Sequence, residues 1–391
     1  MTNRERMLAV LEGKPYDRIP VMNMGYWKET LMAWHGAGHL SPKDYGMDAL
    51  PSHPDGYEEL VAYRGEMRPV WYVGKQVVDE RMGFEVNWMC AYHPATDLFP
   101  SFETKVLERL PNGHVKMQNA EGLLIVEMSG STSIHGHAGT LMTGRDAWEE
   151  LYLPKLQFSP DRVDMEAIEK IKRGEHPDMA VGLYAGSLFG TVRNWMGIEE
   201  VSYLFADDPG LFAEILQTRG ELMYRVMEFV LQTGVKFDFI HYWEDICFKN
   251  GPLISPKIFE QILGPLYQRI NDLARQFGIR LVSVDSDGMV DHLLPTWFGH
   301  GVNVIFPIEV GTWGGSLEPW RRQYGPGLRG VGGMDKRVLS QDRAAIDREM
   351  ERLRRLVDMG GFLPCPDHLI TPDARWENLQ YYVGEHRKYF G

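Results

Sequence analysis

The chain has 391 residues, of which 44% are hydrophobic and 24% charged, a balance typical of a globular protein that buries a large core. Its formal net charge of −13, with basic residues interleaved among acidic ones, argues against a nucleic-acid partner, because backbone binding needs clustered Lys and Arg. No run approaches the roughly 20 apolar residues of a membrane helix, so we expect no membrane association. Three widely separated cysteines and a charged start without an apolar signal core predict a cytoplasmic protein without disulfides.

The first third of the chain predicts a helix, a strand and a β-rich excursion. Apolar residues at helical spacing predict a helix over Asn3–Leu11, ended by Gly13-Lys14-Pro15, and a short strand follows at Ile19–Met24. Asn112-Gly113, between two alternating segments, is the strongest short signal for a hairpin. We therefore expect a β-hairpin excursion on an early loop, at about residues 100–140, rather than a second domain.

From about residue 160 onward, short apolar runs alternate with long amphipathic stretches. Strands are predicted at Met179–Tyr184, Phe237–Tyr242, Arg280–Val284, Val302–Phe306, Leu328–Val331 and Gly361–Leu363, and helices at Leu211–Leu231, Pro256–Phe277 and Gln341–Met359. This alternation indicates βαβ units and a parallel sheet. With the N-terminal strand, the count comes close to the eight of a (β/α)8 TIM barrel, the α/β fold that we expect over residues 1–391.

Charged side chains follow five consecutive predicted strands. They are Glu244 and Asp245, Asp285 and Asp287, Glu309, the group Asp335-Lys336-Arg337, and Asp367-His368. In a parallel barrel the carboxyl ends of the strands meet at one rim, where active sites are assembled. Any single Asp after a strand is equally well the N-cap of the next helix. The convergence of so many strands favours a functional rim.

Two of these acids and a histidine have the chemistry of a metal site. Asp285 and Asp287 are two apart in a strand, so they point the same way and, with His368, predict a divalent metal site, with zinc as the candidate ion. Cys365 is a further candidate ligand, although a lone Cys beside prolines is more often a buried small apolar residue. In a metal-free alternative, His368 is protonated by its acidic neighbours.

Four segments resemble the uroporphyrinogen decarboxylase superfamily, and the resemblance covers essentially the whole chain. They are Asn3-Arg4-Glu5-Arg6, Asp17–Val21, Tyr184-Ala185-Gly186-Ser187 and His368–Asn378. The resemblance implies a (β/α)8 barrel and one of two chemistries. One is cofactor-free decarboxylation of the acetate arms of uroporphyrinogen. The other is zinc-dependent methyl transfer to or from a corrinoid protein, as in coenzyme M methyltransferases and anaerobic O-demethylases.

Departures from the family pattern argue against the decarboxylase. The true decarboxylases carry Arg-Gln-Ala-Gly-Arg after the first strand, and those arginines hold the carboxylates of the tetrapyrrole. Here the corresponding stretch, Asn23–Trp27, has no arginine, and bidentate Arg is hard to replace in that task. The tyrosine that decarboxylases use after the Ala-Gly strand falls near Asn194.

Other segments look most like the O-demethylase branch. They are Glu244–Pro256 and Gly332–Arg337. Asp285-Ser286-Asp287-Gly288 falls on the His-x-Cys-Gly zinc motif of coenzyme M methyltransferases, and His368 falls at or near their later Cys. The resemblance implies a catalytic set of Glu244 as the acid, Asp245 as its partner, and His368. Candidate substrate-binding residues are Tyr26, Trp27, His241, Tyr242, Asn250, Glu309, Lys336 and Arg337; the aromatic rings among them either pack in the core or wall a pocket for a flat ligand.

The expected function is therefore that of a corrinoid-linked methyltransferase. It would remove a methyl group from a small substrate, either a methoxylated compound, which we expect to be aromatic, or another methylated compound, and pass it to a Co(I) corrinoid protein. No cobalamin-binding segment is visible, so the corrinoid (cobalamin) would arrive on a partner protein or free. The alternatives are a uroporphyrinogen-type decarboxylase and a non-catalytic barrel that binds a corrinoid or a metabolite. A homodimer stays open as the assembly.

Overall fold

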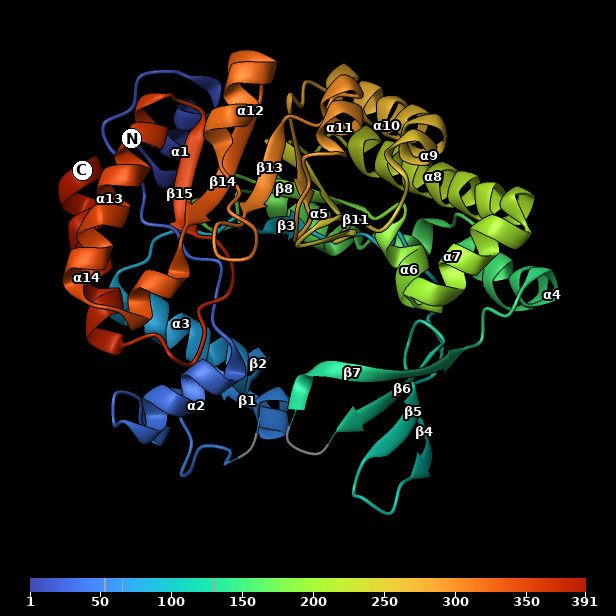
Figure 1. Ribbon diagram of the computed structural model, residues 1–391, viewed down its shortest axis with the longest axis horizontal. Coiled ribbons are helices and arrows are strands. Elements are labelled where there is room, and N and C mark those ends of the chain that lie inside the picture. Colours follow the sequence, from blue (N-terminus) through green and yellow to red (C-terminus); the bar gives the residue numbers. More distant parts are fainter. Residues whose placement is uncertain (53, 65, 129–130) are drawn as a thin grey trace. The chain divides into compact units, whose positions relative to one another are not determined.

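The computed structural model describes residues 1–52, 54–64, 66–128 and 131–391 (Figure 1). The chain divides into two compact units that alternate along the sequence. The first unit comprises Met1–Trp88, Asp178–Ala180 and Phe306–Gly391, and the second comprises Met89–Pro177 and Val181–Ile305. The expectation of a single domain stays a prediction.

Parallel strands form the sheet of the second unit. They are β3 (Cys90–Tyr92), β8 (Gly182–Gly186), β9 (Phe239–Trp243) and β12 (Leu281–Asp285). Strand β9 pairs in parallel with β8 on one side and with β12 on the other, and β8 pairs in parallel with β3. In the β9–β12 pair, Ser283 lies directly beside His241.

Helices connect these strands, as the alternation in the sequence predicts. In the second unit they are α4 (Arg145–Ala147), α5 (Met165–Lys172), α6 (Gly190–Met196), α7 (Ile198–Asp207), α8 (Pro209–Gln232), α9 (Pro256–Ile258), α10 (Gly264–Gln276) and α11 (Leu294–Gly299). The side chain of Asp208 caps α8 by accepting a hydrogen bond from the Leu211 N–H at 2.8 Å. The single helix predicted over Pro256–Phe277 is interrupted by a π-helical turn, Phe259–Leu263, just before Pro265. Proline cannot donate the backbone hydrogen bond of a continuous helix.

The β-rich excursion is confirmed as an antiparallel sheet of the second unit. Its strands, in spatial order, are β4 (Lys105–Arg109), β5 (Val115–Gln118), β6 (Leu123–Met128) and β7 (Ser131–Thr140). Its last strand, β7, is one that the Ser- and Gly-rich sequence does not predict. A small hairpin of β10 (Cys247–Phe248) and β11 (Gly251–Pro252) follows β9.

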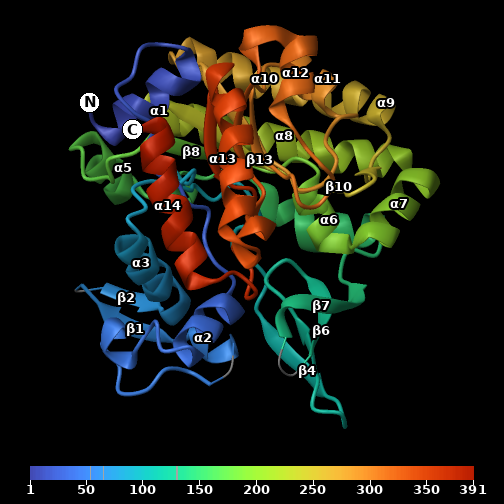
Figure 2. The same ribbon diagram turned by 60° about the vertical axis from the view of Figure 1, so that its left-hand side comes forward.

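The first unit contains the N-terminal and C-terminal parts of the chain. Its elements are α1 (Asn3–Glu12), α2 (Lys28–Gly36), β1 (Leu60–Tyr63), β2 (Glu66–Pro69), α3 (Val70–Met82), α12 (Leu317–Tyr324), β14 (Arg329–Met334), α13 (Arg343–Asp358), β15 (Phe362–Pro366) and α14 (Trp376–Phe390). Strands β14 and β15 are parallel, and α13 and α14 run side by side (Figure 2). Strand β13 (Val304–Ile308) begins in the second unit and ends in the first.

The short strand predicted at Ile19–Met24 is wrong: the segment makes only an isolated bridge between Met22 and Val86. Pro20 has no N–H to donate, and the N–H of Val21 is bound by the Glu85 side chain at 3.0 Å. The segment's other backbone hydrogen bonds go to separate partners: the Ile19 N–H bonds the Phe390 carbonyl at 2.9 Å, and the Asn23 N–H bonds the Val86 carbonyl at 3.1 Å. No continuous ladder forms, and β3 supplies the early strand instead.

The fold is α/β and of the TIM-barrel type. Seven strands form one sheet in the order β15-β14-β13-β12-β9-β8-β3. The predicted strands after residue 178 all occur, each shifted by one to three residues toward the C-terminus. Within the described ranges, no helix is long and apolar enough to cross a membrane.

His386 gives a stability prediction for the first unit. It is fully buried in α14 between Tyr382 and Phe390, and among the described residues neither of its ring nitrogens has a hydrogen-bond partner. Burial lowers the pKa of His386 to about 3; Glu85 opposes this shift, while Arg387 and Arg18 add to it. The unfolded chain therefore takes up a proton first, and stability falls by about 1.4 kcal/mol per pH unit as the pH drops below roughly 6.5.

Replacing His386 by Phe should therefore stabilise the protein, and the gain should grow between pH 7 and pH 4. Chemical denaturation at several pH values measures this. The matched control is His292→Phe, since His292 is exposed. A gain that does not depend on pH would mean that His386 is not kept neutral by its burial.

Candidate active site

The parallel sheet of the second unit has a polar face. Successive residues of a strand point to opposite sides, so β9 places His241 on one face and Tyr242 on the other. Tyr242 is fully buried, donates a hydrogen bond to Asn271 Oδ1 of α10 at 2.8 Å, and packs edge-on against Tyr267. Helix α10 therefore covers the Tyr242 side. We call the opposite side, which carries His241, the site face.

A row of polar side chains crosses the site face. The register places Ser283 of β12 on one side of His241 and Tyr184 of β8 on the other. The Ser283 hydroxyl and His241 Nδ1 are 3.1 Å apart, and both residues are buried. Barrel interiors are ordinarily filled by Val, Ile and Leu. Polar groups at neighbouring positions of three strands therefore indicate a site rather than core packing.

The aromatic ring of Phe239 lies on the site face, on the amino-terminal side of this row of polar side chains. Phe239 lies two residues before His241 on the same face, and its ring lies over Gly182 of β8. A Cβ at Gly182 would come within 2.3 Å of Phe239 Cζ, so only glycine accommodates the ring. Because the Phe239 ring fills the site face at the start of β9, the polar side chains are confined to the carboxyl ends of the strands.

Two residues near β3 extend the polar row. The His93 ring is exposed and stacks on Tyr184 with centroids 4.9 Å apart. Desolvation and the neighbouring His241 lower the pKa of His93, which favours the neutral imidazole. Burial, with a smaller contribution from Asp285, raises the pKa of the Cys90 thiol. Cys90 therefore remains a thiol rather than a reactive thiolate.

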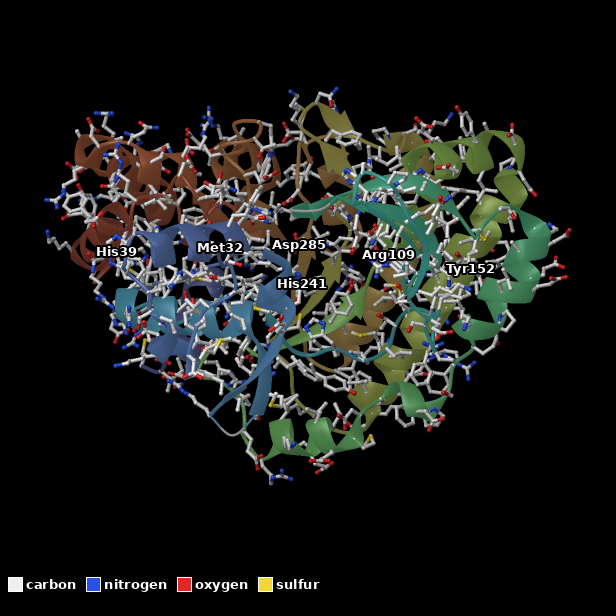
Figure 3. All side chains as sticks on the ribbon, turned by 90° about the horizontal axis from the view of Figure 1, so that it is seen from below. Met32, His39, Arg109, Tyr152, His241 and Asp285 are labelled. Carbon is white, nitrogen blue, oxygen red and sulfur yellow. The ribbon has the colours of Figure 1, made fainter. Side chains whose placement is uncertain are left out.

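Asp285 is the last residue of β12 and lies two residues after Ser283, on the carboxyl-terminal side of the row. Its Oδ2 is 3.9 Å from His241 Nε2, and 19% of its side chain is exposed. Figure 3 labels both residues. Burial raises the pKa of Asp285; His241 opposes this shift, while the carboxylates of Asp287 and Asp245 add to it. A carboxyl group with a raised pKa holds its proton closer to neutral pH, as a general acid must.

Glu244 is fully buried and binds the loop that follows β8. Its carboxylate accepts hydrogen bonds from the Ser187 hydroxyl (3.1 Å), the backbone N–H groups of Leu188 (2.8 Å), Phe189 (3.0 Å) and Gly190 (2.9 Å), and the Tyr267 hydroxyl (2.6 Å). The backbone approaches so closely that a Cβ at Gly190 would lie 1.9 Å from the Glu244 carbonyl oxygen. Donors on both oxygens suit a carboxylate that holds structure, and proton donation by Glu244 stays a prediction.

Asp245 turns the chain away from β9. It has a positive φ of 47°, and Arg193 of α6 holds it by donating to its carbonyl oxygen at 2.6 Å and to Oδ2 at 3.4 Å. The Arg193 guanidinium also lies 5.7 Å from the centre of the Trp243 ring. Asn250, a predicted substrate-binding residue, is exposed at the turn between β10 and β11. Its role stays a prediction.

Tyr26 and Trp27, in the first unit, were predicted to bind substrate. Tyr26 is buried and donates a hydrogen bond to Asp79 Oδ1 at 2.8 Å, and the same oxygen accepts from Asn23 Nδ2 at 2.7 Å. Lys75 binds the other Asp79 oxygen at 2.8 Å. The stretch that aligns with the decarboxylase arginines therefore belongs to a closed hydrogen-bonded group. Trp27 is half-buried at the start of α2.

The rim acids of the first unit also hold loops. Asp367 is buried and accepts hydrogen bonds from the N–H groups of Val310 (2.9 Å), Gly311 (2.8 Å) and Lys336 (3.2 Å). Asp335 pairs with the exposed Arg337 at 2.7 and 2.8 Å. Glu309 is buried and accepts from the Thr312 hydroxyl at 2.8 Å. The side chain of Lys336 is half-buried, as is that of His368.

The proposed metal ligands belong to different units. Asp285 and Asp287 are in the second unit, and His368 is in the first. Cys365 is buried, and the pKa of its thiol is raised chiefly by burial, with a smaller contribution from the Asp367 carboxylate. Across the part of the chain that the structure describes, no group of three or more His, Cys, Asp or Glu side chains is arranged to hold a metal ion. The metal and its ligands stay a prediction.

The sequence did not predict Cys90, His93, Tyr184 and Ser283 as site residues. Strand β3 has only three residues and is followed by Pro94, so no run of alternating residues marks it. Ser283 lies inside an apolar run, and its role depends on its position beside His241. A polar residue at an inward position of a predicted strand is the signal that could have identified it.

No protein-family model matches the chain, and no curated protein matches its sequence. Among solved structures, a methyltransferase from Methanosarcina mazei is similar over 99% of both chains, with 16% identity and a TM-score of 0.55. A B12-independent methionine synthase from Shewanella sp. W3-18-1 is similar over 95% of this chain and 98% of its own, with 10% identity and a TM-score of 0.45. The first likeness supports the fold.

Proposed function

We propose that this chain is a methyltransferase that removes a methyl group from a small methoxylated or methylated compound and passes it to a Co(I) corrinoid. The observation that carries the proposal is the pair of His241 and Asp285, 3.9 Å apart at the carboxyl ends of β9 and β12. A solved structure described as a methyltransferase has the same fold, which makes the chemistry compatible with the scaffold.

The pair would serve the leaving group. When an O–CH₃ bond breaks and its carbon is captured by the acceptor, the oxygen leaves with both bonding electrons and needs a proton. Asp285 has a raised pKa and partial exposure, so it can hold that proton near the leaving oxygen. Ser283 would fix the ring of His241, and His241 would bind the carboxylate that remains. No step is routed through a metal ion.

The rival decarboxylation receives less support. It requires cationic groups for the many carboxylates of a porphyrinogen, and the aligned stretch offers Asn23 and Tyr26, which are bound to Asp79. We expect no conversion of uroporphyrinogen to coproporphyrinogen by the purified protein.

The test is a screen with two arms. One arm incubates the protein with methoxylated aromatics and methylamines together with chemically reduced cobalamin, and measures methylcobalamin by its absorbance. The other arm incubates the protein with uroporphyrinogen and measures coproporphyrinogen. Methylcobalamin formation that depends on the protein supports the proposal. Turnover in the second arm alone would replace the proposal with the decarboxylase.

A further inference from the structure

The turn between β5 and β6 carries the carboxylate of Glu121, and side-chain hydrogen bonds hold the backbone of this turn. Asn119 Oδ1 accepts hydrogen bonds from the N–H groups of Glu121 and Leu123, both at 2.9 Å, which fixes the turn. The buried Tyr152 donates its hydroxyl to the Glu121 carbonyl at 3.2 Å. The backbone of Glu121 is therefore held by two side chains.

The Glu121 side chain points to α6, which borders the site. Asn194 Nδ2 lies 3.4 Å from Glu121 Oε1, and Arg193 donates to Asn194 Oδ1 at 2.9 Å. Arg193 also holds the loop after β9 through the Asp245 carbonyl at 2.6 Å. A chain of hydrogen bonds thus connects the antiparallel sheet to the carboxyl end of β9.

A second carboxylate lies close to Glu121. Asp97 follows β3 and accepts a hydrogen bond from the fully buried Arg219 at 3.1 Å. Arg219 also donates to the carbonyls of Thr96 (2.9 Å) and Ser187 (2.6 Å), so it joins the loops after β3 and β8. Burial raises the pKa of Glu121 and Asp97 adds to the shift, whereas Asn194, Arg193 and Arg219 oppose it. Glu121 is half-buried.

We propose that Glu121, supplied by the antiparallel sheet, is a specificity-determining residue that accepts a hydrogen bond from a hydroxyl or amine N–H of the substrate. Its backbone is fixed on both sides, and the long Asn contacts at 3.4 and 3.5 Å are weak competitors for its oxygens. A hydroxyl or N–H group of a bound ligand would form a stronger hydrogen bond with this carboxylate than either Asn side chain does. This inference rests on the proposed function for the identity of the site, and it concerns binding rather than methyl transfer.

The experiment measures binding by calorimetry to the full chain. The probes are 2-methoxyphenol and 2-methoxyaniline, which carry a donor, and methoxybenzene, which does not. The variants are Glu121→Gln and Glu121→Ala, and the matched control is Glu127→Gln, an exposed residue of β6 in the same sheet. The readout is the affinity ratio of a donor probe to methoxybenzene, because partial misfolding would lower both affinities equally.

We expect a ratio of about 10 or more in the parent and in Glu127→Gln, since one hydrogen bond to a charged group is worth about 1.5–3 kcal/mol. In Glu121→Ala the ratio should fall toward 1, with an intermediate value in Glu121→Gln. An unchanged ratio in Glu121→Ala, or a parent that does not prefer the donor probes, would overturn the inference. If the parent prefers the donor probes, Glu121→Ala loses that preference and no methyl transfer is found, the role of Glu121 in binding is supported. Only the proposed methyltransferase function is then contradicted.

Discussion

Replacing Glu244 by Ala is expected to destabilise the second unit by about 5 kcal/mol or more, because each buried donor left without an acceptor costs about 1–3 kcal/mol. Three backbone N–H groups and two hydroxyls bind this carboxylate, and the side chain is fully buried. Glu244→Gln should cost about 2 kcal/mol, since its NH₂ group would face the N–H of Leu188 or those of Phe189 and Gly190. Urea denaturation followed by circular dichroism measures both losses.

The matched control is Glu221→Gln, which replaces an exposed partner of Arg269 and should change stability by less than about 0.5 kcal/mol. The Gln variant also separates the two roles of Glu244. If it is as stable as the parent and loses turnover about 10²-fold, Glu244 is the general acid that the sequence suggested. Loss of stability without a comparable loss of turnover in the folded fraction supports the loop-holding role.

Replacing Asp285 by Asn is expected to lower turnover about 10²-fold or more while leaving the fold intact, because Asn cannot deliver a proton to the leaving oxygen. Asn has nearly the same size as Asp and keeps one oxygen toward His241 Nε2. Steady-state kinetics with the substrate found in the screen measure the effect. The control is Asp272→Asn on the exposed side of α10, where Asp272 pairs with Arg275.

The Asp285→Asn variant should also be more stable than the parent at pH 7. The pKa of Asp285 is raised in the folded protein, so the folded state binds its proton more tightly than the unfolded chain. Stability is therefore lost as the pH rises from near 4 through the folded pKa, and Asn removes that loss. We expect a higher melting temperature at pH 7 and a smaller gain near pH 4. Full activity together with unchanged stability would place Asp285 outside the chemistry.

The sequence predicted most of the fold because hydrophobic periodicity is a local signal. The helices at Leu211–Leu231 and Gln341–Met359 occur as α8 and α13, each within two residues of the expected ends. The strand at Ile19–Met24 does not form because its backbone donors are bound by distant groups, among them the Glu85 side chain and the Phe390 carbonyl, which no local pattern reveals. Strand β3 is too short for periodicity to mark it.

The site was predicted less completely, because strand position and side-chain contacts were unknown. Acids after strands were correctly located at strand ends, but Glu244 and Asp367 bind backbone N–H groups of neighbouring loops. His241 and Tyr242 were predicted together as substrate-binding residues, yet adjacent residues in a strand face opposite sides. Tyr242 therefore contacts α10, and only His241 lies on the site face.

Transfer of an isotopically labelled methyl group tests the central claim most directly. A substrate carrying ¹³CH₃ is mixed with stoichiometric protein and cob(I)alamin, and the product is analysed by ¹³C NMR for methyl bonded to cobalt. The account predicts label on cobalt in a single turnover with the parent, about 10²-fold slower transfer with Asp285→Asn, and no release of the methyl group when cobalamin is omitted. Demethylation at the same rate without any corrinoid, or transfer that is unaffected in Asp285→Asn, would contradict it.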